Sequence, residues 1–393
     1  MLEVMSGKTL EWSLGLWTAS VDLTKALDRV EHAALFEALR RQGLRESYVA
    51  LVSEMYDGQV GGLRGSKQFV IKRGVRQGDV LSPLLFNSAL EDAVARWKRR
   101  LARHGWQLDA DDSAERLTNV RFADDLMLYA KSEQELIYML DTLQEELAAS
   151  GLQLNPDKTK VLTTAAPPLP NFLATAAGEV EVLLGEKTHK YLGKTLVGRS
   201  ADRARAAVNG RVTAAWGKWY QHKKTLVNQK IPLKLRLKLF SAVVCPAATY
   251  SLESSTVAKS HAQKLDVVQR KMLRALAGWR RKCDESWHTT MRRMRERVAR
   301  AMRIHRVEPW SQSLLRKKYR LATKVAAADS TSWARRVVNW CPPALEQEAA
   351  PCRFAGRPPR RWDDDLNEFC GGDGSWMSTL GTRSEDDFAL SAR

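Results

Sequence analysis

The stretch Val120-Arg121-Phe122-Ala123-Asp124-Asp125-Leu126-Met127-Leu128-Tyr129 sets two adjacent carboxylates between two apolar runs. This pattern predicts two short strands joined at a tight turn, with Asp124 and Asp125 at its tip. Burying an unpaired carboxylate costs several kcal/mol. A divalent cation would offset that cost, because hard ions such as Mg²⁺ are held by carboxylate oxygens and substrate phosphates. An ordinary solvated turn also fits the pair, so other segments must decide between the two.

The whole chain has the composition of a globular protein. Its 393 residues are 44% apolar and 27% charged, enough for two domains or one large domain. No apolar run approaches the roughly 18 residues that span a bilayer, and the N-terminus lacks a secretory pattern. The five cysteines are widely spaced without a Cys-x-x-Cys pair: Cys245, Cys283, Cys341, Cys352 and Cys370. We therefore expect an intracellular protein with reduced thiols and no membrane partner.

Positive charge is concentrated in one part of the chain. The net charge is +18, yet residues 199–324 hold 31 Lys/Arg against 7 Asp/Glu. Solvated helix faces usually mix both signs, whereas this segment is almost single-signed. A polyanion partner explains it better than a membrane surface or solubility alone, and nucleic acid is the commonest polyanion.

Apolar periodicity predicts an α+β arrangement up to about residue 200. We expect a strand over 19–23 that ends at an acid, two helices within 31–56 separated at Gly43, and a strand within 68–75. The dipeptide Ser82-Pro83 predicts a helix with a serine N-cap and proline at the first helical position.

The helix after the acidic turn is marked by the pair Ser132 and Glu135, which has the spacing of a capping box, and by Gly151 as its stop. Residues 1–18 show little periodicity and residues 341–393 are rich in Pro and Gly, with an acidic, mobile end. The expected division is 1–18 as an N-terminal remnant, 19–200 as an antiparallel sheet packed on helices, 201–340 as a basic helical region, and 341–393 as the C-terminal segment.

Two further segments accompany the acidic turn. They are Val21-Asp22-Leu23-Thr24-Lys25-Ala26-Leu27-Asp28-Arg29-Val30 and Gly74-Val75-Arg76-Gln77-Gly78-Asp79-Val80-Leu81-Ser82-Pro83-Leu84-Leu85-Phe86-Asn87. Nucleotidyl transfer needs charge neutralised and reactants aligned, which two metal ions about 3.5 to 4 Å apart achieve. Such a site requires carboxylates from separate strands, and Asp22 and Asp124 have that character.

In this order and spacing, the three segments resemble motifs A, B and C of the reverse transcriptases of non-LTR (LINE-type) retrotransposons. Gly151-Leu152-Gln153-Leu154-Asn155-Pro156-Asp157-Lys158-Thr159-Lys160 resembles motif D, and Tyr191-Leu192-Gly193 resembles motif E. Residues 234–250 and 264–278 resemble the thumb and post-thumb regions, and 356–365 a run near the C-terminus of such elements. The likeness covers about residues 19–370 and implies a polymerase palm followed by a thumb-like region.

The resemblance implies a role for each motif residue. Asp22 and Asp124 would bind two Mg²⁺ or Mn²⁺ ions, with Asp125 beside them as an electrostatic or secondary metal partner and the Leu23 carbonyl as an extra ligand. Three residues of motif B would line the templating base pair and the incoming nucleotide: Arg76, Gln77 and Gly78. Lys158 would protonate the leaving pyrophosphate, with a plain surface lysine as the alternative.

Two other acidic positions receive structural interpretations. Asp28 suits a cap at a helix start, and the run Asp363-Asp364-Asp365 is interpreted as solvated.

Two departures from the family bear on activity. The family usually carries Phe or Tyr, whose ring excludes a 2′-hydroxyl, where this chain has Leu27, so we expect weaker sugar discrimination. Only about twenty residues precede Asp22, where the family has a fingers region, and this loss would slow the reaction.

The resemblance implies RNA-directed DNA synthesis on an RNA template with a DNA primer and dNTPs, in an intracellular ribonucleoprotein of the nucleus or cytoplasm. The alternative is a nucleic-acid-binding remnant without catalysis. A group II intron-type maturase relative, which shares the palm, is disfavoured by the thumb-like stretches. Protein partners are not predicted.

Overall fold

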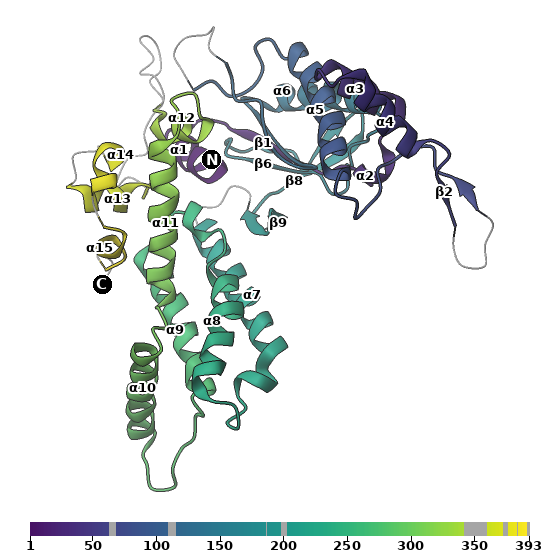
Figure 1. Cartoon of the computed structure of the whole chain (residues 1–393). Coiled ribbons are helices and arrows are strands. Elements are labelled where there is room, and N and C mark those ends of the chain that lie inside the picture. Colours follow the sequence, from purple (N-terminus) through teal and green to yellow (C-terminus); the bar gives the residue numbers. More distant parts are fainter. Residues whose placement is uncertain are drawn as a thin grey trace, which may run out of the picture.

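The computed structural model describes residues 1–62, 68–108, 115–185, 187–197, 203–341, 360–371, 376–382 and 384–390. A sheet covered by helices occupies one end of the molecule, and long helices extend from it (Figure 1). Cys352 and the stretch 356–359 lie outside the described residues.

The sheet has six strands in the order β4-β5-β1-β6-β8-β7. Their bounds are β1 (Trp17–Val21), β4 (Asn119–Phe122), β5 (Asp125–Ala130), β6 (Lys160–Thr163), β7 (Phe172–Thr175) and β8 (Gly178–Val182). Every neighbouring pair is antiparallel except β6 and β8, which are parallel. The central position of β1 explains why all five of its residues are buried.

Alternate residues of β5 enter two different cores, as the two-residue period of a strand requires. Leu126 and Leu128 pack with helices on one face, namely α2 (Ala26–Arg29), α3 (His32–Arg41), α4 (Glu46–Tyr56), α5 (Ser82–Arg100) and α6 (Glu133–Ala148). Met127 and Tyr129 pack on the other face with α1 (Leu2–Glu11) and α12 (Trp333–Asn339). The expected α+β class is confirmed.

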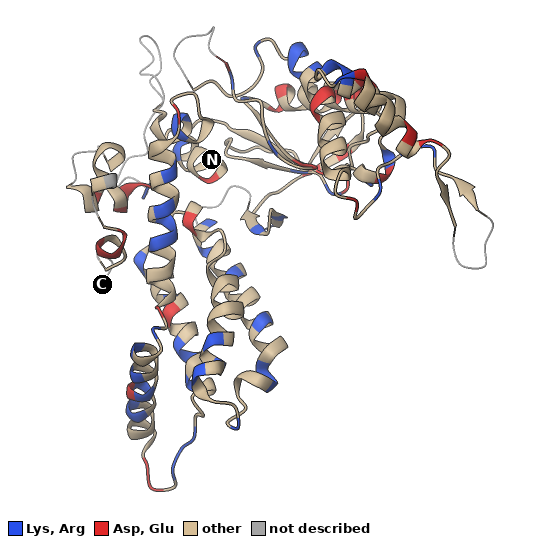
Figure 2. Ribbon diagram, in the orientation of Figure 1, with Lys and Arg blue, Asp and Glu red and all other residues tan. Residues whose placement is uncertain are grey.

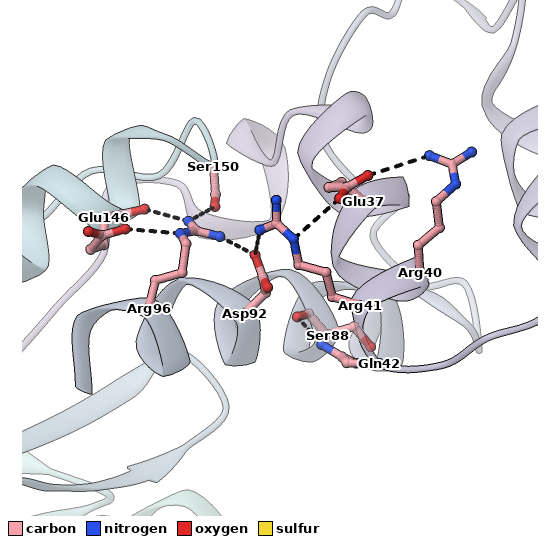
Figure 3. Close-up of polar contacts among 9 residues, drawn as sticks. All are labelled: Glu37, Arg40, Arg41, Gln42, Ser88, Asp92, Arg96, Glu146 and Ser150. Atoms are coloured by element: carbon pink, nitrogen blue, oxygen red, sulfur yellow. Dashed lines mark hydrogen bonds and ion pairs between the residues drawn. The ribbon is translucent and has the colours of Figure 1, made fainter. Parts of the chain in front are cut away.

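A polar network locks the helices behind the sheet (Figure 3). Asp92 of α5 accepts hydrogen bonds from Arg41 of α3 and from Arg96 one turn along α5. Arg96 also donates to Glu146 of α6 at 2.9 Å and to the Ser150 hydroxyl at 3.1 Å. These charge-assisted bonds cross-link α3, α5 and α6 over the face of the sheet that carries Leu126 and Leu128. Helix α6 follows the hairpin that carries the acidic turn, so the network also restrains that hairpin.

Most predictions made from short sequence patterns were confirmed. The β4–β5 hairpin forms at the predicted turn, and the apolar stripe of α5 is buried. The Ser132 hydroxyl accepts from the Glu135 N–H, as expected, but the Glu135 carboxylate accepts from the Lys131 N–H instead of closing the box on Ser132. Ser82 is not an N-cap: it is the first residue of α5, and the cap is Leu81.

Residues 1–18, which show little periodicity in the sequence, nevertheless contain regular structure. Residues 2–11 form α1, and β1 begins at Trp17. Met5 of α1 is fully buried in the core on the Met127 face of the sheet. The N-terminal residues therefore contribute to the core of the sheet domain.

The predicted strand within 68–75 is reduced to β3 (Phe69–Val70), which pairs with β2 (Val60–Gly61).

The long helices form a second core. They are α7 (Arg203–Leu226), α8 (Leu233–Thr249), α9 (Lys259–Leu276), α10 (Trp287–Ile304) and α11 (Trp310–Ala327), with the short η1 (Leu252–Ser254). At its centre Phe240 stacks on Trp310 with ring centroids 6.1 Å apart, and Trp219 meets Phe240 edge-on. The hairpin of β9 (Thr188–Tyr191) and β10 (Lys194–Val197) connects this bundle to the sheet. Lys and Arg are spread along these helices (Figure 2).

The C-terminal segment is helical where it is described, so the expected mobile acidic end was wrong. Its elements are α13 (Asp364–Cys370), α14 (Trp376–Thr379), η2 (Leu380–Thr382) and α15 (Glu385–Leu390), which pack with α11. The run Asp363-Asp364-Asp365 is not simply solvated, because Asp365 pairs with the buried Lys318 of α11. None of the helices in the described ranges is long and apolar enough to cross a membrane.

Candidate active site

Three carboxylates lie in the same region of the molecule, where the central strands end. Asp22 follows β1 directly, and the pairing of Val21 with Leu126 brings it to the start of β5, where Asp125 lies. Asp124 occupies the two-residue turn between β4 and β5. Partial burial raises the pKa of Asp125, and the nearby Asp124 and Asp22 raise it further. Like charges gathered in this way favour binding of a cation.

Asp22 has a carboxylate oxygen that accepts no hydrogen bond from the described residues. Its Oδ2 is buried and has no hydrogen-bond partner among the described residues. Lys158 Nζ forms an ion pair with this oxygen at 3.7 Å, a distance beyond hydrogen-bond length. Buried polar atoms normally have a partner, so a carboxylate oxygen left in this state fits a hard divalent ion.

The protein alone does not complete a metal-ligand set. Within the described ranges, no three His, Cys, Asp or Glu side chains are already gathered in positions that would hold an ion. An ion at Asp22 and Asp124 would need further oxygens, and Mg²⁺ commonly takes them from substrate phosphates and water. Asp22, with its unpartnered oxygen, and Asp124 are the described residues that would hold such an ion.

Backbone pairing fixes Asp22 against the segment that carries Lys158. The Asp22 carbonyl accepts from the Asn155 N–H at 2.8 Å, and the Thr24 N–H donates to the Gln153 carbonyl at 2.8 Å. Leu23, between them, forms a bridge with Leu154 and is buried. The Lys158 N–H donates to Asn155 Oδ1, so the segment turns back and its side chain, 69% exposed, reaches toward Asp22.

The motif B loop, residues 74–81, is held to α2 by backbone hydrogen bonds. The Val75 N–H donates to the Leu27 carbonyl at 2.7 Å, and the Gly74 N–H donates to the Val30 carbonyl at 2.8 Å. Gly74 has φ +90°, and a Cβ there would lie 2.8 Å from the Asp28 carbonyl oxygen. Only glycine permits so close an approach.

Sequence reasoning misjudged Asp28. It lies inside α2, whose N-cap is Lys25, so it is not a helix cap. Its Oδ1 instead accepts a hydrogen bond from Gln77 Nε2 at 3.0 Å. Arg76, Gln77 and Gly78 are all exposed on the loop, so this bond gives Gln77 a fixed orientation.

Two residues of β9 complete the surroundings of the acids. His189 Nε2 lies 3.0 Å from the Ser20 hydroxyl, and burial lowers its pKa, as does Lys160, while Asp22 acts in the opposite direction. Burial raises the pKa of Tyr191 to about 12, with a further contribution from Asp125. The sequence showed the Tyr-Leu-Gly motif but not its position, because a contact between distant segments leaves no local pattern.

Comparison with known proteins finds a family match in the first half of the chain. Residues 9–196 match the family model described as reverse transcriptase (RNA-dependent DNA polymerase). The Pol polyprotein of the type-2 retrotransposable element R2DM from Drosophila melanogaster is 34% identical over 146 residues, covering 36% of this chain and 13% of that protein. An R2 element Pol polyprotein from Popillia japonica is 28% identical over 288 residues, covering 70% of this chain and 44% of that protein.

A third relative and a solved structure extend the comparison. The RNA-directed DNA polymerase from the mobile element jockey of Drosophila melanogaster is 25% identical over 293 residues, covering 70% of this chain and 29% of that protein. The chain thus spans less than half the length of each of these three relatives. Apo telomerase from Candida tropicalis is similar with a TM-score of 0.34 and 14% identity, over 82% of this chain and 53% of that one.

Proposed function

Because this chain carries a reverse transcriptase domain of the non-LTR retrotransposon type, we propose that it catalyses RNA-templated DNA synthesis by two-metal nucleotidyl transfer. The observation that carries the proposal is the meeting of Asp22, Asp124 and Asp125 at the ends of paired strands, with one Asp22 oxygen left unsatisfied. When bound, two Mg²⁺ or Mn²⁺ ions would neutralise charge on the phosphates and activate the primer 3′-hydroxyl.

The side chains around the acids have distinct proposed roles. Asp22 and Asp124 would hold the metals, Asp125 would add negative charge beside them, and the Leu23 carbonyl would supply a further oxygen. Lys158, now 3.7 Å from Asp22 Oδ2, would give its proton to the departing pyrophosphate. A lysine suits this task because its ammonium group carries three rotatable N–H donors that can reach a phosphate oxygen.

The loop would position the nucleotide. Arg76 and Gln77 would contact the template and the incoming dNTP, and Gly78, with φ +92°, would let the backbone approach them closely. Leu27 is only partly buried against the core, so part of its side chain is free to face a nucleotide. Because leucine is smaller than an aromatic ring, it would offer less bulk against a 2′-hydroxyl. The proposed setting is an intracellular ribonucleoprotein with RNA template and DNA primer.

A second candidate is nucleic-acid binding without catalysis. It is favoured by the single-signed charge of residues 199–324, with 31 basic and 7 acidic side chains, which would bind a polyanion whether or not the acids function.

Primer extension on an RNA template separates the two candidates. Asp124→Asn removes one metal-binding charge with little change in shape, and we expect about a thousandfold loss of extension, equivalent to about 4 kcal/mol of transition-state stabilisation. Asp57→Asn is the matched control, because Asp57 is exposed at the end of α4. Equal extension by the wild type and Asp124→Asn, with salt-sensitive RNA binding retained, would establish the second candidate instead.

A further inference from the structure

A groove of 320 Å³ lies between α9 and α10, in the part of the helical bundle that points away from the sheet (Figure 1). Arg270 and Arg274, one turn apart on α9, line one side, and Arg295 of α10 lines the other. Val298 and Met302 of α10 contribute apolar surface to it. We call these three arginines and the space between them the arginine groove.

Positive charge exceeds negative charge in the arginine groove, where three arginines and one aspartate, Asp266, line the space. None of its three guanidinium groups pairs with a carboxylate in the described ranges, although Arg270 Nε donates to the Asp266 backbone carbonyl at 3.1 Å. Asp266 also lines the groove. Its two carboxylate oxygens, however, accept from the Ser311 N–H at 2.9 Å and the Ser311 hydroxyl at 2.7 Å.

The crowding has an electrostatic consequence. Burial lowers the pKa of Arg274, and the neighbouring Arg295 and Arg270 lower it further. Three like charges around one small space repel one another, and the repulsion weakens when an anion lies between them. A guanidinium group donates in a planar fork that matches the oxygens of a phosphate.

We propose that the arginine groove binds backbone phosphates of an RNA strand at a place separate from the acidic turn. RNA as the source of the phosphates rests on the proposed function, whereas the anion site rests on the groove itself. The surrounding bundle is strongly basic, which favours a polyanion over a single small anion. Because the acids lie at the sheet, whereas α9 and α10 extend away from it (Figure 1), the strand held here is not the reacting end.

Binding of a labelled 20-nucleotide single-stranded RNA, followed by fluorescence anisotropy over a range of salt, tests the proposal. All variants carry Asp124→Asn, so the result does not depend on polymerase activity. Arg274→Ala and Arg295→Ala should each weaken binding about tenfold and reduce the slope of log affinity against log salt by about 0.7. Arg300→Ala removes the same charge from an exposed position of α10 outside the groove and should change affinity less than about twofold.

A second measurement controls for folding. Inorganic phosphate should raise the thermal midpoint of the Asp124→Asn parent more than that of its Arg274→Ala variant. Arg274→Lys keeps the charge but loses the planar fork, so it should restore only part of the RNA affinity. Equal losses for Arg300→Ala and Arg274→Ala would overturn the proposal in favour of diffuse attraction. Displacement of the RNA by polyglutamate at equal charge concentration would also overturn it, because the groove would then be a site for an acidic protein.

Discussion

Asp125 is the carboxylate whose ionisation the fold opposes, through burial and then through Asp124 and Asp22. Because the pKa of Asp125 is higher in the folded than in the unfolded chain, the protonated carboxyl favours folding. This contribution to the free energy of unfolding is fully present below the unfolded pKa of about 3.9 and is lost as pH rises through the folded pKa. In metal-free buffer, Asp125→Asn should therefore melt higher than the wild type at pH 7. The gap should shrink as pH falls toward 4, and Mg²⁺ should reduce it. A gap that stayed constant over this range, or that Asp57→Asn reproduced, would contradict this account.

Asp28 acts on the loop through Gln77, to which it is joined by a 3.0 Å hydrogen bond. Asp28→Ala should raise the KM for dNTP several-fold while changing kcat less, because the loop loses a fixed orientation worth roughly 1 kcal/mol. Asp28→Asn keeps an acceptor oxygen and should restore most of the affinity. Gln77→Ala and the double variant Asp28→Ala/Gln77→Ala complete the cycle. If the free-energy change in KM for the double variant equals the sum of the two single changes, the two residues do not act together.

Individual site residues differed in how far the sequence could predict them. The order of the motifs placed Asp22, Asp124 and Lys158 in one candidate site, and the structure brings these residues into one region. The bond between Asp28 and Gln77 joins residues 49 positions apart. No local pattern records it, and the same aspartate reads equally well as a cap.

At the scale of elements, two glycines that follow helices allow two costs of adding a side chain to be compared. One cost is the positive φ that both share, and the other is a close backbone neighbour that only one of them has. Gly43, after α3, has φ +83° and open space around it, whereas Gly151, after α6, has φ +77° and a Cβ there would lie 2.6 Å from the Arg29 carbonyl oxygen. Gly43→Ala should cost about 1 kcal/mol, and Gly151→Ala roughly 2 kcal/mol more because α2 must move. Urea denaturation measures both. Similar costs would show that α2 tolerates the displacement.

The prediction of helices and strands succeeded where the apolar residues of a segment all fall on one face. The stripes of α5 and α6 and the hairpin of β4 and β5 follow from apolar spacing alone. It failed for α13, because the acidic run there is stabilised by Lys318, 47 residues away. A charge run looks solvated in the sequence whenever its partner is distant.

At the scale of the whole molecule, the two ends of the chain meet. In α1, Lys8 is 7% exposed, and its Nζ donates to the carbonyls of Val338 and Trp340, both at 2.5 Å, at the end of α12. Arg361, before α13, donates two hydrogen bonds to Glu11 of α1. Helix α1 thus packs behind the sheet and also contacts the segments that follow the bundle, so it couples the sheet to the C-terminal region.

Lys8→Met tests this coupling, because methionine keeps the length of the side chain and removes its donors. The carbonyls at the end of α12 would lose a charged donor, which should cost about 1.5 to 3 kcal/mol. Lys72→Met, at an exposed position, removes the same charge and should change stability by less than about 0.5 kcal/mol. If the N-terminal helix holds the C-terminal region in place, limited proteolysis of Lys8→Met should also release C-terminal fragments sooner than proteolysis of Lys72→Met. Loss of stability without earlier release would mean that the contact supports the sheet domain but does not couple it to the C-terminal helices.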